Sequence, residues 1–159
     1  EERMMPWQKI RVVREPLLDY CHVLPRKRGE HIRTILVMLG DRATEADYLS
    51  VIEGLKSDYK VLLSIHPQVK IELKSDIYNW EEIDAVVVDA SVSITLFLQE
   101  QRIPFLVPID LATSRPMWTS IDELYDGTIK VSELTEKIKH KEFSTLKMNL
   151  STIKLNQLI

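Results

Sequence analysis

Short apolar runs, each followed by a helical pattern, constrain the fold of this chain more than any other feature. Residues 34–39 contain no charge and are closed by Gly40, which is typical of a strand buried on both faces. A helical pattern begins at Thr44, with Asp47 three residues later as in a capping box. Further strands are predicted at 59–65, 85–88, 103–109 and 128–131, with a short one at 70–73. Helical segments are predicted at 79–83, from 91 to about 101, at 119–124 and at 132–140.

Strands that alternate with helices need crossover connections, which leave the strands parallel and place helices on both faces. The sequence therefore predicts an α/β, Rossmann-like doubly wound domain over residues 34–142, with a mainly parallel sheet of about five strands. Pro104 and Pro108 favour a short or edge strand at 103–109. Residues 1–33 form a separate amino-terminal segment or linker in this interpretation. Residues 143–159 are expected to form a final helix, because Leu146, Leu150 and Ile153 follow helical spacing.

The composition of the chain limits the binding partners and the cellular compartment that we expect. A net charge of -3, with both signs interspersed, provides no field for nucleic acid or an anionic membrane. The basic run at 25–28 is the local exception, and it is read either as a solvated loop or as a phosphate or lipid contact. Cys21 is the single cysteine, which favours a reducing, cytoplasmic location. No spacing of histidines and carboxylates matches a zinc motif, and we expect neither a metal nor a cofactor. A start at Glu1 without Met suggests a piece of a longer protein.

Polar residues follow the successive predicted strands. Ligands of open parallel sheets bind outside the carboxyl ends of the strands, where loops and helix amino termini converge. The candidate ligand-binding residues are Arg42, Asp89, Ser91, Ser93, Asp110 and Arg115, and the candidate catalytic residue is His66. The row of side chains predicts a binding site at this edge of the sheet.

Phosphate is the ligand group that these residue types suit. Ser91 and Ser93 open a helix whose free amides and positive dipole end attract an anion, and the two arginines are suited to bidentate contacts. His66 can donate to a phosphate oxygen or act as an acid or base. The alternatives are structural: Ser91 and Asp89 as helix caps, Arg42 as a surface cation, and His66 bonded to a carbonyl. Neither GxGxxG, GxxxxGK[ST] nor GxSxG is present.

A family resemblance rests on five stretches in order. They are residues 34–42 ending in Gly-Asp-Arg, Ser64-Ile-His-Pro67, Asp89-Ala-Ser-Val92, residues 102–110 ending in Asp110, and Arg115-Pro116. Over residues 33–138 this order resembles the carboxyl-terminal half of the CDP-glycerol glycerophosphotransferases, the teichoic-acid and capsule polymerases with a two-domain GT-B glycosyltransferase fold. The chain departs from that family at Ser64, Ala90, Val92 and Pro116, where the family has Lys, Tyr, Ser and Gly.

The resemblance implies a domain that binds a nucleotide-diphosphate donor, linked to CDP or UDP. His66, Ser91 and Arg115 would lie near the donor pyrophosphate, and His66 would assist departure of the nucleotide. The family's amino-terminal acceptor domain has no counterpart in the first 33 residues, so that half would come from a longer protein or a partner subunit. Alone, this chain is expected to be at most an inactive part of a transferase.

Two other classes of function stay open. A receiver-like or flavodoxin-like signalling domain would use Asp89 as phosphoacceptor, although Asp41 is followed by Arg42 rather than by a second acid and Lys130 does not fit the expected lysine position. A non-catalytic α/β module would instead scaffold a partner through its apolar tail from Phe143.

Overall fold

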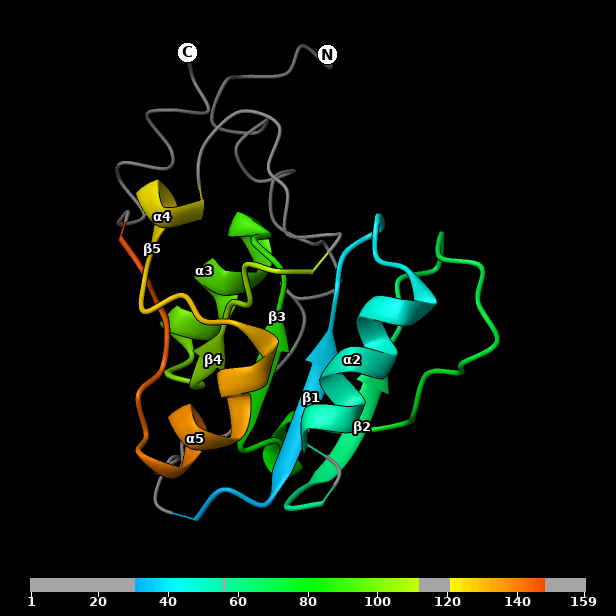
Figure 1. Cartoon of the computed structure of the whole chain (residues 1–159), viewed down its shortest axis with the longest axis horizontal. Helices are drawn as coiled ribbons and strands as arrows, with labels where there is room; N and C mark the ends of the chain where they lie inside the picture. Colours follow the sequence, from blue (N-terminus) through cyan, green and yellow to red (C-terminus); the bar gives the residue numbers. More distant parts are fainter. Residues whose placement is uncertain (1–30, 56, 112–120, 148–159) are drawn as a thin grey trace, which may run out of the picture.

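The computed structural model of the chain describes residues 31–55, 57–111 and 121–147 (Figure 1). The order of elements alternates strands and helices over most of this span. It is β1 (Thr34–Met38), α2 (Glu45–Leu55), β2 (Lys60–Ser64), the 3₁₀ turn η2 (Trp80–Glu82), β3 (Ala85–Val88), α3 (Val92–Glu100), β4 (Phe105–Leu106), α4 (Ile121–Leu124), β5 (Tyr125–Asp126), the 3₁₀ turn η4 (Val131–Glu133), α5 (Leu134–Lys139) and β6 (Thr145–Leu146).

Four parallel strands form the main sheet, in the order β2-β1-β3-β4. The chain thus reverses its direction of winding between β1 and β3, which makes their carboxyl ends the switch point of the sheet. The predicted fifth strand is reduced to one parallel bridge between Pro108 and Ile129. A separate antiparallel pair joins β5 to β6. The predicted Rossmann-like α/β class is confirmed.

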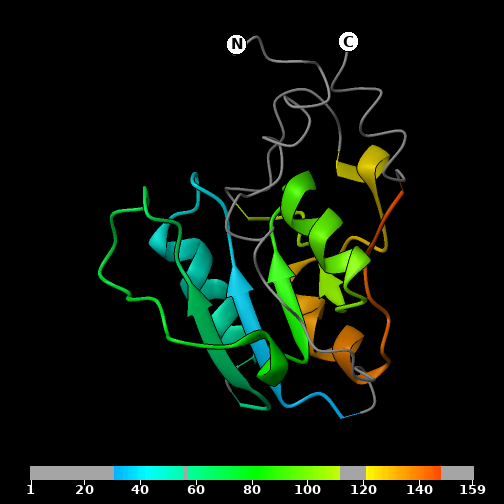
Figure 2. The ribbon, with the colours of Figure 1, turned by 180° about the vertical axis from the view of Figure 1, so that it is seen from behind.

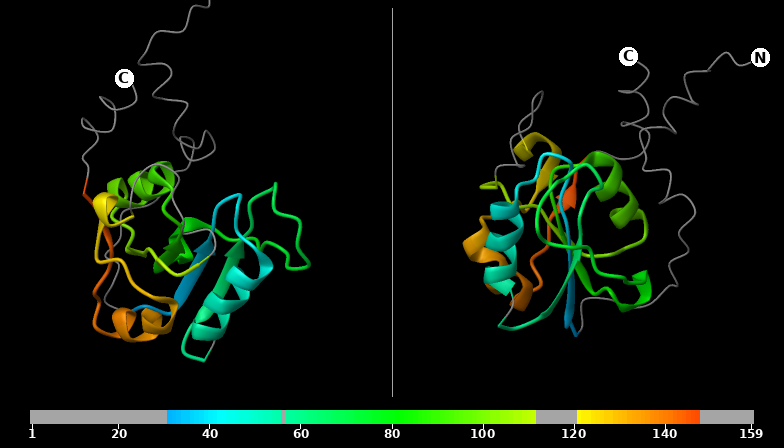
Figure 3. Two further views of the ribbon diagram at one scale, coloured as in Figure 1. Left: turned by 45° about the horizontal axis from the view of Figure 1, so that its top comes forward. Right: turned by 90° about the vertical axis from the view of Figure 1, so that its right-hand side faces the viewer.

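Helices cover both faces of the sheet, because successive side chains of each strand point to opposite sides. In β1, Ile35 and Val37 pack with the residues of α2 and α5, whereas Leu36 packs on the opposite side with α3 and η2. Figure 2 shows α3 from behind, and the right-hand view of Figure 3 shows the sheet as the middle layer between α2 and α5 on one side and α3 on the other.

Three local predictions differ from the structure. Residues 70–73 form no strand. The fourth strand keeps only Phe105–Leu106 of the predicted 103–109, because the prolines on both sides supply no amide donor. In the tail, residues 145–146 form β6 instead of a helix, and the Gln99 side chain holds both main-chain groups of Leu146 at 2.8 and 3.2 Å. Residues 1–30 and 148–159 lie outside the described part of the chain.

Candidate functional site

Strand register brings the predicted site residues to one edge of the sheet. Met38 is the register partner of both Ser64 on β2 and Val88 on β3. Two residues beyond those positions stand Gly40, His66 and Ala90, which therefore leave the sheet at the same level. His66, Asp89 and Ser91 follow the ends of strands, as the sequence predicted, and Asp89 and Ser91 follow β3 at the switch point.

Asp89 lies against Gly40 in the crevice between β1 and β3. Its side chain is buried, and Oδ1 accepts a hydrogen bond from the Ser91 amide at 3.2 Å. A Cβ added to Gly40 would overlap Asp89 Oδ2 and would lie 3.2 Å from Cγ. Gly40 is therefore required by close approach rather than by backbone conformation. The sequence indicated Gly40 only as the end of a strand, although a glycine at that position is a signal for such an approach.

Ser91 begins α3 but does not cap it. Its backbone is extended, with φ -80° and ψ 112°, and its side chain makes no capping hydrogen bond. Ser91 Oγ instead lies 3.4 Å from Ser93 Oγ, and its carbonyl accepts from the Thr95 hydroxyl at 2.9 Å. The structure therefore rejects the interpretation of Ser91 as a side-chain cap. The amides of the first turn have no intrahelical acceptors and donate no hydrogen bond to the side chain of this serine.

His66 occupies a tight turn just past β2. The Val69 amide donates to the His66 carbonyl at 2.9 Å, and the Gln68 amide donates to the imidazole Nδ1 at 3.1 Å. A ring nitrogen that accepts carries no proton, so the neutral imidazole has its proton on Nε2. His66 is partly exposed, and its Nε2 is thus a donor available to a ligand oxygen.

Tyr48 holds the ends of β1 and β2 at this edge of the sheet, and the sequence interpretation did not identify it as part of the site. The tyrosine comes from α2 and is fully buried, and its hydroxyl donates to the carbonyls of Ser64 at 3.2 Å and Leu39 at 3.4 Å. Burial raises the pKa of the Tyr48 hydroxyl above its ordinary value, and the charge of Asp89 adds to the rise. Tyr48 therefore stays neutral and ties the ends of β1 and β2 together. Its place in an amphipathic helix indicated only a core residue.

The other predicted residues differ in position. Arg42 is exposed in the turn after β1. Asp110 follows β4 and its Oδ1 accepts from the Val131 amide at 3.0 Å, which gives it a structural role at the start of η4. Ser93 is partly exposed in the first turn of α3. Arg115 lies outside the described residues.

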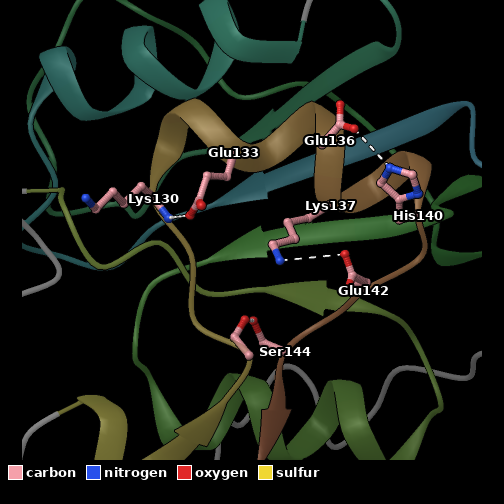
Figure 4. A network of polar contacts seen from close by, with 8 residues as sticks. Lys130, Glu133, Glu136, Lys137, His140, Glu142 and Ser144 are labelled. Carbon is pink, nitrogen blue, oxygen red and sulfur yellow. Dashed lines mark hydrogen bonds and ion pairs between the residues drawn. The ribbon is translucent and has the colours of Figure 1, made fainter.

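A second group of polar residues lies around α5, away from this edge (Figure 4). His140 Nε2 lies 2.9 Å from Glu136 Oε2, and Lys137 Nζ lies 3.6 Å from Glu142 Oε1. Figure 1 shows α5 near the end of the sheet where β1 begins. These pairs lie at the surface, where solvated ion pairs contribute little to stability.

Within residues 31–55, 57–111 and 121–147, no three His, Cys, Asp or Glu side chains are grouped so that they could hold a metal ion. In the same part of the chain no helix has the length and apolar character needed to cross a membrane.

No protein-family model, no curated protein and no solved structure matches the chain.

Proposed function

We propose that the chain is the nucleotide-donor-binding domain of a glycosyltransferase-like or glycerophosphotransferase-like protein of cell-surface polymer synthesis, and that the diphosphate binds across the carboxyl ends of β2, β1 and β3. The observation that carries the proposal is the start of α3. Ser91 leaves the first-turn amides of this helix without a side-chain cap, directly beside the switch point. A helix amino terminus in this position attracts phosphate through its amides and its dipole.

The spacing of the strands supports a diphosphate rather than one phosphate. Neighbouring strands lie about 4.8 Å apart, so the ends of β2 and β3 are separated by roughly 10 Å. A diphosphate with its nucleoside spans this separation and contacts both His66 and Ser91 more readily than a single phosphate group does. The oxygens of the phosphate nearest α3 would accept hydrogen bonds from backbone amides and from the hydroxyls of Ser91 and Ser93.

His66 would then contact the far end of the diphosphate. With Nδ1 held by the Gln68 amide, Nε2 can donate to a phosphate oxygen and stabilise the charge that grows as the nucleotide leaves. Transfer needs an acceptor held in line with the donor, which agrees with a second domain that provides the acceptor. Binding, rather than turnover, is thus the property expected of this chain.

Thermal shift and isothermal titration calorimetry with CDP, UDP and CDP-glycerol test the proposal. A ligand at about 100 times its dissociation constant should stabilise the fold by roughly 2.7 kcal/mol. His66→Ala should weaken the binding, whereas His140→Ala, a histidine variant on α5, should bind like the wild type. No stabilisation by any of these nucleotides would refute the proposal.

A second candidate function, a receiver-like phosphoacceptor domain, is favoured by one observation. The strand order β2-β1-β3-β4, with the bridge from Pro108 to Ile129 beyond it, is the flavodoxin-like order, and Asp89 stands directly after its central strand β3. In this function the Asp89 carboxylate would attack acetyl phosphate, form an acyl phosphate and release acetate. Incubation with acetyl phosphate and magnesium, followed by intact mass spectrometry, should then show one added phosphoryl group that is absent in Asp89→Asn.

A further inference from the structure

The outer edge of β2 is covered by two side chains from the loop that follows it. β2 is the end strand of the described sheet. In Figures 1 and 2 the loop between β2 and η2 runs along the outer side of this strand. Residues 70–73, which were predicted to form a short strand, belong to this loop.

The alternating direction of the backbone amides and carbonyls along β2 shows which of these groups face outward. The Lys60 amide donates toward β1, to the Arg33 carbonyl at 2.8 Å. Alternate residues of a strand direct their amides and carbonyls to opposite sides, so the outward-facing residues are Val61 and Leu63 of β2 and Ile65 directly after it. These are the residues through which another strand would pair.

Ser75 and Asp76 occupy the outward groups of two of these three residues. Asp76 donates its amide to the Leu63 carbonyl at 2.8 Å, and its Oδ2 accepts from the Leu63 amide at 2.8 Å. Ser75 Oγ accepts from the Ile65 amide at 2.7 Å and lies 3.5 Å from the Ile65 carbonyl. Most of the pairing is thus made by side chains, which present no second row of backbone groups on their far side.

We propose that Ser75 and Asp76 form an edge guard, a device that stops the sheet of one chain from pairing with β2 of a second copy. An unguarded edge strand presents amides and carbonyls that template pairing with another chain. The natural occupant is a second copy, because two β2 edges can pair antiparallel about a twofold axis and satisfy the same outward groups reciprocally. The guard fills the outward groups of Leu63 and Ile65 within one chain.

Sedimentation velocity over a range of protein concentrations tests the proposal with the full chain. The variant Ser75→Ala with Asp76→Ala should associate more tightly than the wild type, with a dimer dissociation constant lower by roughly tenfold or more. Hydrogen exchange at Leu63 and Ile65 should be faster in the dilute variant than in the wild type and slower in its dimer. Lys74→Ala, an exposed neighbour, and the conservative pair Ser75→Thr with Asp76→Asn should behave like the wild type.

One further substitution separates edge pairing from association of a misfolded chain. Val61→Pro in the double-alanine background removes an outward donor without breaking the ladder to β1, and it should restore the wild-type association constant. Circular dichroism reports whether each variant is folded. If the folded double-alanine variant associates no more than the wild type, or if Val61→Pro leaves its association unchanged, the edge guard is refuted.

Discussion

Replacement of Gly40 by alanine should destabilise the fold by roughly 1.5 to 5.5 kcal/mol. The new Cβ would overlap Asp89 Oδ2, so either the β1 turn or the carboxylate must move. Forcing a group into a packed site costs about 1–3 kcal/mol, and loss of the hydrogen bond from the Ser91 amide to a charged acceptor costs about 1.5–3 kcal/mol. The smaller entropy of an unfolded chain with alanine returns about 0.4–1 kcal/mol.

Gly54→Ala is the matched control for this substitution. Gly54 lies exposed within α2, and a Cβ there would meet its nearest atom, the Val131 carbonyl oxygen, at an ordinary 3.6 Å. Alanine is the better helix former, so this variant should be more stable than the wild type by roughly 0.5–1 kcal/mol. The two glycine substitutions should therefore change the free energy of unfolding in opposite directions.

Urea denaturation followed by circular dichroism measures both effects, and a double-mutant cycle with Asp89→Ala assigns the cause. If the overlap with the carboxylate is responsible, Gly40→Ala should cost at least about 1 kcal/mol less in the Asp89→Ala background. Equal costs in the two backgrounds, or a Gly40→Ala variant as stable as the wild type, would show that the contact does not constrain position 40.

Three other predictions concern the stability of the fold. Arg102 follows α3 with a φ of 58°, a left-handed conformation that glycine adopts at lower cost. Arg102→Gly should therefore raise the free energy of unfolding by about 0.5–1 kcal/mol, seen as a higher urea midpoint, and an unchanged midpoint would show that this conformation costs arginine nothing. Ser144 is buried and its Oγ accepts from the Val107 amide at 3.0 Å and donates to the Gly127 carbonyl at 2.7 Å, so Ser144→Ala should cost about 1–3 kcal/mol in the same assay, and no loss would mean that water replaces the hydroxyl. Burial raises the pKa of Tyr125 far above 10.0, so the unfolded chain loses this proton first, and the free energy of unfolding should fall as pH rises past about 10. Tyr125→Phe should reduce that alkaline slope in urea titrations at several pH values, and an unchanged slope would exclude Tyr125 as its source.

The fold class could be predicted from the sequence because its signals are local. The apolar run at β1 and the capping box of Thr44 and Asp47 are both present in the structure, the latter with reciprocal hydrogen bonds of 3.1 and 3.2 Å. Strand order depends on pairings between distant segments, which no window of sequence contains. The order β2-β1-β3-β4, and with it the switch point between β1 and β3, therefore came only from the structure.

The tail shows how a distant contact overrides a local pattern. Leu146, Leu150 and Ile153 have helical spacing, but the Leu146 backbone is held by Gln99 and lies opposite Tyr125 in the β5–β6 pair. Gln99 is 47 residues away in the chain. Periodicity measures which face of a segment is apolar and carries no information about such partners.

For the candidate site, the polar residues at the strand ends could be predicted from the sequence, but the contacts that join them to distant elements could not. Parallel strands bring their carboxyl ends to one edge, so residues that follow the strands meet there whatever the strand order. The contact of Gly40 with Asp89 and the link from the Tyr48 hydroxyl to the Ser64 carbonyl join separate elements. Both contacts fix the backbone from which the candidate residues project.

Asp89 has a different role in each of the two candidate functions, and its environment favours one of these roles. Its side chain is only 7% exposed and accepts a hydrogen bond from the Ser91 amide, which limits the access of a phosphoryl donor to the carboxylate. As an acceptor for the Ser91 amide at the start of α3, the same carboxylate needs no rearrangement. Asn at position 89 retains an acceptor oxygen and lacks the nucleophile. Nucleotide binding that survives Asp89→Asn, without any phosphoryl transfer in the wild type, is therefore the result that the geometry favours.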